Sequence, residues 1–403
     1  MLSQVFRRES GRVLAGLIGE LGDFDAAEDV WQDALSKAAE VWPRDGVPEN
    51  PGAWLTTVAR NRARDVLRRG ARGIERHQEA PELAAPDPEP EVPQVDLLRL
   101  IFTCCHPALA PAAQVALTLR TLGGLTTFEI ARAFLESEPA TAQRLVRAKK
   151  KIREAKIPYA VPTSARLPER LEGVLSTLYL VFNEGYSASQ GDSLIRRELC
   201  DEAIRLARSL SELLPKEPEA WGLLALMQLH HARRDARTTA GGELIPLEDQ
   251  DRSRWRQDEI ERGSQTLDRA IAMKKRGPFQ LQAAVAALHC AARTPRETDW
   301  RQIELLYGAL LALQNTPTVA LNHAVAVAMS QGIDAGLVLI AGLDAELEDY
   351  YLLPAARADL LRRAGRFSEA ALAYEKALQL VKNAKERRYL ERRLACLPGR
   401  GSQ

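Results

Sequence analysis

Apolar residues repeat at helical spacing along most of this 403-residue chain, and this pattern restricts it to an architecture built from helices. From Leu167 onward, amphipathic segments of roughly 12–18 residues follow one another, separated by glycine or proline, with no pattern typical of a strand. Two shorter blocks with the same periodicity precede this array. We therefore predict an all-α fold.

A proline-rich acidic stretch separates the first two helical blocks. Between Arg76 and Asp96 the chain contains five prolines and five acidic residues, but no lysine or arginine. Such a composition favours an extended linker. We predict a helical block at 1–75, this linker at 76–95, a second helical block at 96–156, a proline-containing joint at 157–168 and a long helical array at 169–403.

Composition excludes several classes of protein. The five cysteines are scattered, and the chain has neither a secretory segment at its start nor an apolar run long enough for a membrane helix. We expect a cytoplasmic protein with no membrane association and no cofactor. Cys104, Cys105 and His106 are zinc-binding residue types, but three consecutive helical residues point in different directions, so we predict packing and no metal.

The first block predicts an acidic helix followed by an arginine-rich helix. Asp23 or Asp25 can cap the first helix, and Trp31 and Trp54 are expected in the core. The polar face of the first helix carries Glu28, Asp29, Gln32 and Asp33. The second helix, with Leu55 and Leu67 on its apolar side, carries Arg60, Asn61, Arg62, Arg64, Arg68, Arg69 and Arg72. This density of arginine either forms a surface that binds phosphates or is only a solvated face.

The second block has the pattern of a helix-turn-helix. Thr126 and Glu129 are spaced as a capping box, and Ser137 can cap a second helix with Pro139 in its first turn. On that helix, the residues expected to point inward are Ala142, Leu145, Val146, Ala148 and Ile152. The opposite face carries Ala140, Gln143, Arg144, Arg147 and Lys151, a spacing suited to a recognition helix in a major groove. We expect Gln143 and Arg144 to read base edges, and Arg147, Lys149, Lys150 and Lys151 to contact phosphates.

These blocks resemble regions 2 and 4 of extracytoplasmic-function (ECF) sigma factors. The segment 27–33 looks like the family's clamp-binding helix, 54–69 like its −10 helix, and 124–131 with 144–149 like its −35 reader. The resemblance implies that Glu28, Asp29, Gln32 and Asp33 bind core RNA polymerase, and that Arg60, Asn61, Arg64, Arg68 and Arg69 bind −10 promoter DNA. For the −35 element it implies Ala140, Gln143, Arg144, Arg147, Lys150 and Lys151. Glu136, Glu138 and Pro139 depart from the family's pattern by adding negative charge and stiffness near the DNA face.

The long array resembles tetratricopeptide helix pairs at 355–380, and more weakly at 318–343 and 219–237. Such pairs must stack to bury their apolar faces, and stacking yields a concave surface. Segments 98–120, 179–189, 247–255 and 320–327 extend the resemblance to the ECF subgroup with a tetratricopeptide-like C-terminal extension. That resemblance implies an extension that controls activity, through a regulatory protein or a ligand, with its sign left open.

Several polar residues of the array either line a pocket or cap and bridge helices. They include Asn183, Glu184, Tyr186, Asp249, Asp251, Arg252, Trp255 and Asn322. Glu184 and Asp251 have the chemistry of an acid and a base, but no nucleophile, phosphate loop or metal cluster accompanies them. We therefore expect that the chain is not an enzyme.

Three alternatives remain at this point. A helix-turn-helix regulator with a tetratricopeptide sensor would not bind core polymerase, and it leaves the 24–69 block unexplained. A helical-repeat scaffold would make the basic helices incidental. An enzyme would need a site within 180–255. A sigma factor, with core RNA polymerase and promoter DNA as partners, accounts for both N-terminal blocks.

Overall fold

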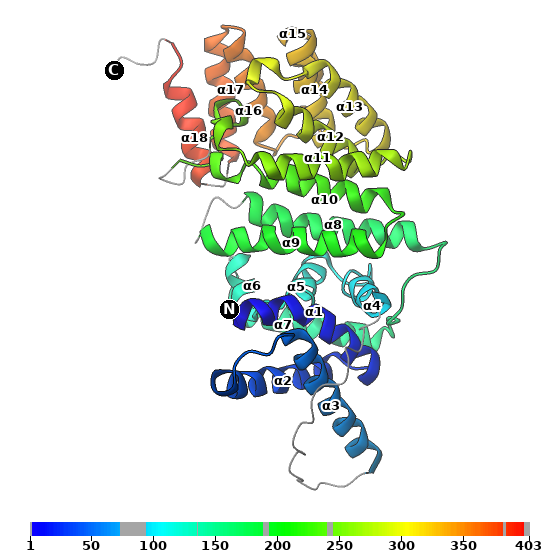
Figure 1. The fold of residues 1–403 in the computed structure, drawn as a ribbon. Helices are drawn as coiled ribbons and strands as arrows, with labels where there is room; N and C mark the ends of the chain where they lie inside the picture. Colours follow the sequence, from blue (N-terminus) through cyan, green and yellow to red (C-terminus); the bar gives the residue numbers. More distant parts are fainter. Residues whose placement is uncertain are drawn as a thin grey trace. The chain divides into compact units, whose positions relative to one another are not determined.

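The computed structural model describes residues 2–72, 94–134, 136–187, 193–239, 245–381 and 384–398. Helices are the elements of these ranges, with no strand among them, which confirms the all-α prediction (Figure 1). The chain forms two compact units, Met1–Gly185 with Leu194–Leu213, and Tyr186–Ser193 with Leu214–Gln403. Most of the linker predicted at 76–95 lies outside the described residues, which leave out 73–93.

The first unit contains nine of the described helices. They are α1 (Leu2–Leu21), α2 (Phe24–Asp45), α3 (Pro51–Arg72), α4 (Gln94–Cys104), α5 (Pro111–Thr121), α6 (Thr127–Ala133), α7 (Glu138–Glu154), α8 (Leu167–Ser187) and α9 (Ser193–Leu213). The last residues of α8 and the first of α9 group with the second unit. The predicted domain boundary at 168 stays a prediction.

Helices α1, α2 and α3 pack as a three-helix module. Asp23 caps α2, because its carboxylate accepts a hydrogen bond from the Ala26 amide at 2.9 Å. Trp31 is buried, and Trp54 is half-buried with its ring 5.4 Å from that of Trp42. Leu55 is fully buried, but Leu67 is 48% exposed, so its predicted place on the apolar side was wrong. It lies near the C-terminal end of α3, where Arg68 and Arg69 are also exposed.

Helices α4 to α7 form the predicted helix-turn-helix module. Both halves of the capping box are present, since the Thr126 amide donates to Glu129 at 2.8 Å and the Glu129 amide donates to Thr126 Oγ1 at 3.2 Å. Ser137 caps α7. Val146 is 63% exposed, so the inward direction predicted for it was wrong. The inner face of α7 is narrower than the sequence indicated and is made by Thr141, Leu145, Ala148 and Ile152.

Helices α8 and α9 pack against the helix-turn-helix module. Arg170 on α8 donates to the Phe102 carbonyl at 2.5 Å, and Arg205 on α9 donates to the Leu122 carbonyl at 2.9 Å. Figure 1 shows the two helices side by side, and the Cys200 thiol of α9 contacts the Phe182 carbonyl of α8. Two helices of the predicted extension thus belong to the same compact unit as the N-terminal modules.

The second unit consists of successive helix pairs. Its elements are α10 (Pro218–His231), η1 (Arg234–Ala236), η2 (Leu247–Asp249), η3 (Arg252–Arg254), α11 (Gln257–Ala272), α12 (Pro278–Ala291), η4 (Pro295–Glu297), α13 (Trp300–Leu313), α14 (Pro317–Gln331), α15 (Ile333–Ala341), α16 (Leu352–Arg363), α17 (Phe367–Leu380) and α18 (Ala384–Ala395). In the pair α16–α17, Ala358, Ala370, Ala377 and Tyr374 are buried together. Gly365 makes the turn between them at φ +74°.

Two leucines on α3 test the three-helix module. We expect Leu55→Ala to destabilise it by about 2–5 kcal/mol, because the substitution leaves a cavity, and Leu67→Ala by less than about 0.5 kcal/mol. Hydrogen exchange of the α1–α3 amides in the full-length chain measures both effects. Equal acceleration by the two variants would contradict this description of the core.

Candidate nucleic-acid and polymerase interface

Helix α3 presents an arginine-rich face to solvent. Asn61, Arg64, Arg68 and Arg69 are exposed, and none of these arginines forms an ion pair with a residue that the structure describes. Arg60 differs, because its guanidinium lies 3.2 Å from Glu20 and is mostly buried. Four of the five predicted −10 residues therefore share an accessible surface, while Arg60 holds α3 against α1.

The acidic face of α2 is partly occupied by basic residues from α7. The Lys149 ammonium lies 2.9 Å from Asp25 and 3.0 Å from Glu28, and Arg153 lies 3.6 Å from Asp23. Lys149 was predicted to contact DNA phosphates, but it turns toward α2. The reason is that α7 packs beside the N-terminal end of α2, where these carboxylates gather.

The four predicted polymerase-binding residues therefore have different surroundings. Glu28 is 15% exposed and also lies 3.7 Å from Arg120 of α5. Asp33 forms a 2.7 Å ion pair with Arg62 of α3. Asp29 and Gln32 are exposed. The structure thus places three of the four at the surface and Glu28 in the contact between the two modules.

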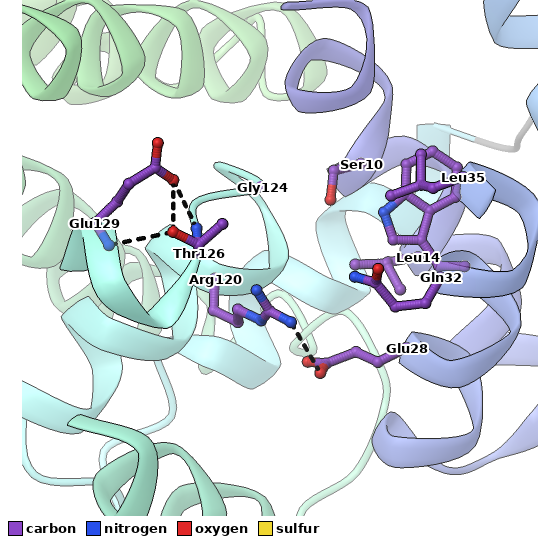
Figure 2. A pocket seen from close by; sticks show the side chains of 10 residues that line it. Ser10, Leu14, Glu28, Gln32, Leu35, Arg120, Gly124, Thr126 and Glu129 are labelled. Carbon is purple, nitrogen blue, oxygen red and sulfur yellow. Dashed lines mark hydrogen bonds and ion pairs between the residues drawn. The ribbon is translucent and has the colours of Figure 1, made fainter. Parts of the chain in front are cut away.

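A cavity of about 290 Å³ adjoins this contact (Figure 2). One side comes from α1 and α2, with Leu14, Glu28 and Gln32, and the other from the second module, with Arg120 and Thr126. Figure 2 shows Arg120 reaching across toward Glu28. Glu28 Oε1 is buried and accepts no hydrogen bond. The carboxylate is therefore held by charge and is incompletely hydrogen-bonded.

The predicted recognition residues line one groove on the second module. The groove has a volume of about 420 Å³ between α7 and the segment 108–113. Its lining includes Ala140, Gln143, Arg144, Arg147 and Lys151. Lys150 is exposed beside it and lies 3.6 Å from Glu154. The helical spacing read from the sequence did bring these residues to one face.

Arg144 is engaged within the module. Its guanidinium forms a bidentate pair with Glu136, at 2.5 and 2.7 Å, and these hydrogen bonds lower the pKa of the Glu136 carboxyl. Glu136 precedes α7 in the loop of the helix-turn-helix. An arginine held in this way is less available to a base edge than Gln143 or Arg147, which are exposed.

Three family models match the chain. Sigma-70 region 2 matches residues 5–73, Sigma-70 region 4 matches 99–152, and a family of unknown function, DUF6596, matches 170–271. An uncharacterized protein of Rhizobium meliloti (strain 1021) is 42% identical over 391 residues, which cover 95% of this chain and 92% of the relative. No solved structure matches.

The chain carries the region 2 and region 4 domains of sigma-70 factors. Its two modules indicate an ECF-like sigma factor and support interaction with core RNA polymerase and promoter DNA. The two domains support a role in promoter-specific transcription. The family of unknown function matched at 170–271 spans α8 to α11, and it therefore includes residues of both compact units.

Two cysteines at the end of α4, within the second module, have the surroundings expected for packing. Cys104 and Cys105 are buried, with their thiols 3.2 and 3.6 Å from the hydroxyls of Thr121 and Thr118. Burial raises the pKa of both thiols. Within the described ranges, no group of three or more metal-binding side chains gathers. None of the described helices is long and apolar enough to cross a membrane.

The structure brings together only part of the pocket predicted in the extension of the sigma factor. Tyr186, Arg252 and Trp255 belong to the second unit and share neighbours there. Asp249 instead forms a 3.0 Å ion pair with Arg393, and Asp251 caps η3 by accepting from the Ser253 amide at 3.0 Å. Asn183 and Glu184 fall in the first unit, and Asn322 is exposed on α14.

Sequence reasoning missed the residues that surround Tyr186 and Trp255. They are His230, Arg233, Arg237 and His289. The signal was present in the run HHARRDAR at 230–237, where two histidines end the mostly apolar helix α10 and three arginines come directly after it. Charged side chains directly after a buried helix can point inward to the helices that pack against it, as well as outward to solvent.

Glu136 provides a test of the recognition groove. We expect Glu136→Gln to raise affinity for a mixed-sequence DNA duplex several-fold and to steepen the salt dependence by about one phosphate contact, because Arg144 is released. Glu138→Gln also removes one carboxylate, at the exposed start of α7, and should raise the affinity for DNA less. Fluorescence anisotropy across a salt series measures both variants. Equal effects would mean that only net charge matters.

Proposed function

We propose that this chain is an ECF sigma factor that binds core polymerase through the acidic face of α2, the −10 strand through α3 and the −35 duplex through α7. The observation that carries the proposal is the placing of an exposed arginine face and a basic groove on two modules of one compact unit. Arginines on α3 suit the phosphates of melted DNA, and Asn61 can hydrogen-bond a base edge. Gln143 and Arg147 are the side chains of the groove best placed to meet a duplex.

The role proposed for α2 requires the contact with α7 to open. Core polymerase would bind the carboxylates that Lys149 and Arg120 now hold, so the polymerase and the second module compete for Glu28. Exposed Asp29 and Gln32 allow a first encounter without any opening. In this view the free chain is closed, and binding of polymerase separates α2 from α7.

We propose that the C-terminal extension controls this opening, as part of the same polypeptide in the cytoplasm. Helices α8 and α9 hold the backbone of the second module at Phe102 and Leu122, close to the ends of α4 and α5. The remaining helices form pairs with small residues at their contacts, which supports a tetratricopeptide-like repeat. Movement within the repeat could then reach the DNA-binding module through α8 and α9 without a separate protein.

Run-off transcription tests the central proposal. Purified core polymerase with the full-length chain is expected to start at a defined site on genomic promoter fragments, and core alone is not. Asp29→Lys should abolish specific starts by repelling the polymerase, whereas Glu49→Lys, a charge reversal at another exposed residue beyond α2, should not. If neither the native chain nor Lys149→Gln directs specific initiation, the sigma function is wrong.

The closed contact makes a separate prediction. A zero-length carbodiimide cross-link should join Lys149 to Asp25 or Glu28 in the free full-length chain, because these groups lie about 3 Å apart. Core polymerase should suppress that cross-link. We expect Lys149→Gln to raise the affinity for core several-fold, while Lys150→Gln, whose side chain points to solvent, leaves it unchanged. A cross-link that persists at full strength in the polymerase complex would contradict the competition.

A further inference from the structure

Two arginines of the second unit, one buried and one half-buried, form no ion pair with a carboxylate among the residues that the structure describes. Arg233, just after α10, is only 5% exposed, and Arg252 at the start of η3 is half-buried. Neither forms an ion pair with a described residue. Two arginines close to them in the sequence do form ion pairs, Arg234 with Glu259 at 2.5 Å and Arg256 with Asp235 at 2.9 Å.

The hydrogen bonds of the two unpaired arginines go to neutral groups. Arg233 Nη2 lies 3.1 Å from the Tyr186 hydroxyl and 2.9 Å from His230 Nδ1. Arg252 Nη1 donates to the carbonyls of His289, at 2.7 Å, and Ala292. These contacts fix the direction of both side chains but do not offset their charge.

Three buried donors remain without an acceptor. They are Nε of Arg233, Nε of Arg252 and the indole Nε1 of Trp255. All three belong to one cluster, because the guanidinium carbons lie 5.8 Å (Arg233) and 4.6 Å (Arg252) from the centre of the Trp255 ring. Buried donors are rarely left unpaired, so the cluster lacks an acceptor.

The two histidines of the cluster, His230 and His289, carry no charge near pH 7. Burial, with Arg233 and Arg252 nearby, lowers the pKa of His289 to about 4. Burial, with Arg233 and Arg237 nearby, holds the pKa of His230 well below its usual value. Both rings are therefore neutral near pH 7, and the positive charge of this interior comes from the guanidinium groups.

We propose that Arg233, Arg252 and Trp255 form a binding site for a phosphate-type oxyanion. A guanidinium withdrawn from water needs a counter-charge, and an anion with several oxygens can accept hydrogen bonds from more than one of these donors. A tetrahedral oxyanion suits donors that come from three separate side chains better than a planar carboxylate does. The ligand is either free inorganic phosphate or the phosphate group of a small metabolite.

A purely structural explanation is stacking of the guanidinium groups on the Trp255 ring. Stacking accounts for the short distances, but it uses the face of the ring and leaves the three N–H donors unpaired. The two explanations differ in one measurable respect. Only an anion site gives saturable binding that depends on both arginines and on the indole N–H.

Calorimetric titration of the full-length chain with inorganic phosphate, at constant ionic strength, tests the site. We expect saturable one-to-one binding and a higher unfolding temperature with phosphate present. Arg252→Met should weaken binding about tenfold or more, since it removes a charged donor. Arg256→Met, four residues along the chain and paired with Asp235, is the matched control and should bind as the native chain does.

A second variant keeps the test decisive if Arg252→Met does not fold. Trp255→Phe preserves an aromatic ring but removes the N–H donor, and we expect it to weaken phosphate binding several-fold. Glucose 6-phosphate distinguishes the sources, because tighter binding than phosphate indicates a metabolite and weaker binding indicates the free ion. Absence of saturable binding, equal binding of chloride and acetate, or equal loss in Arg256→Met would overturn the proposal.

This inference does not depend on the sigma function. The measurements use neither polymerase nor DNA, so a chain that fails in run-off transcription can still bind phosphate, and the reverse also holds. Where both succeed, phosphate can be added to the transcription assay to ask whether it changes initiation.

Discussion

The ammonium group of Lys149 joins the two N-terminal modules, and it adds an ionic contact between α7 and α2 to the packing of α1 against α4. It lies within 3.0 Å of both Asp25 and Glu28, and little of the Lys149 or Glu28 side chain reaches solvent. Removing one member of such a pair leaves the other charge poorly hydrated, which costs more than the loss of an exposed ion pair. The two modules are therefore coupled through charges that lie largely out of solvent.

Helix α7 serves two purposes because successive residues of a helix point in different directions. Lys149 and Arg153 face α2, while Arg147, Lys150 and Lys151 face away from it. One rigid helix thus holds the modules together on one side and forms the groove on the other. A ligand that displaces α7 from α2 does not need to reshape the groove, so opening can expose the acidic face of α2 and leave the recognition surface intact.

The sequence predicted the fold well where local rules decide it. Caps at Asp23, Thr126 and Ser137 follow from side chains that can reach nearby amides, and these predictions are confirmed. The first helix, α1, was not predicted individually, since the acidic and arginine-rich helices dominated that block. Its apolar residues Val13, Leu14, Leu17 and Ile18 complete the core of the module.

The candidate site was less predictable because long charged side chains choose partners that only the tertiary structure brings near. Arg60 and Arg64 lie one helical turn apart on α3, yet Arg60 meets Glu20 and Arg64 meets solvent. Arg144 and Arg147 share a groove, but only Arg144 has Glu136 beside it. Helical spacing predicted the shared face, whereas the availability of each residue depends on loops and on neighbouring helices.

The same distinction explains why the arginine cluster of the second unit was missed. Helix α10 ends at His231, and the chain turns into η1, so that Arg234 reaches Glu259 while Arg233 points inward to Tyr186 and His230. In the first unit, Lys149 and Arg120 withdraw from solvent only where carboxylates receive them. Arg233 is buried more deeply without one. Since an uncompensated buried charge opposes folding, its presence there is best explained by a counter-charge that comes from outside the chain.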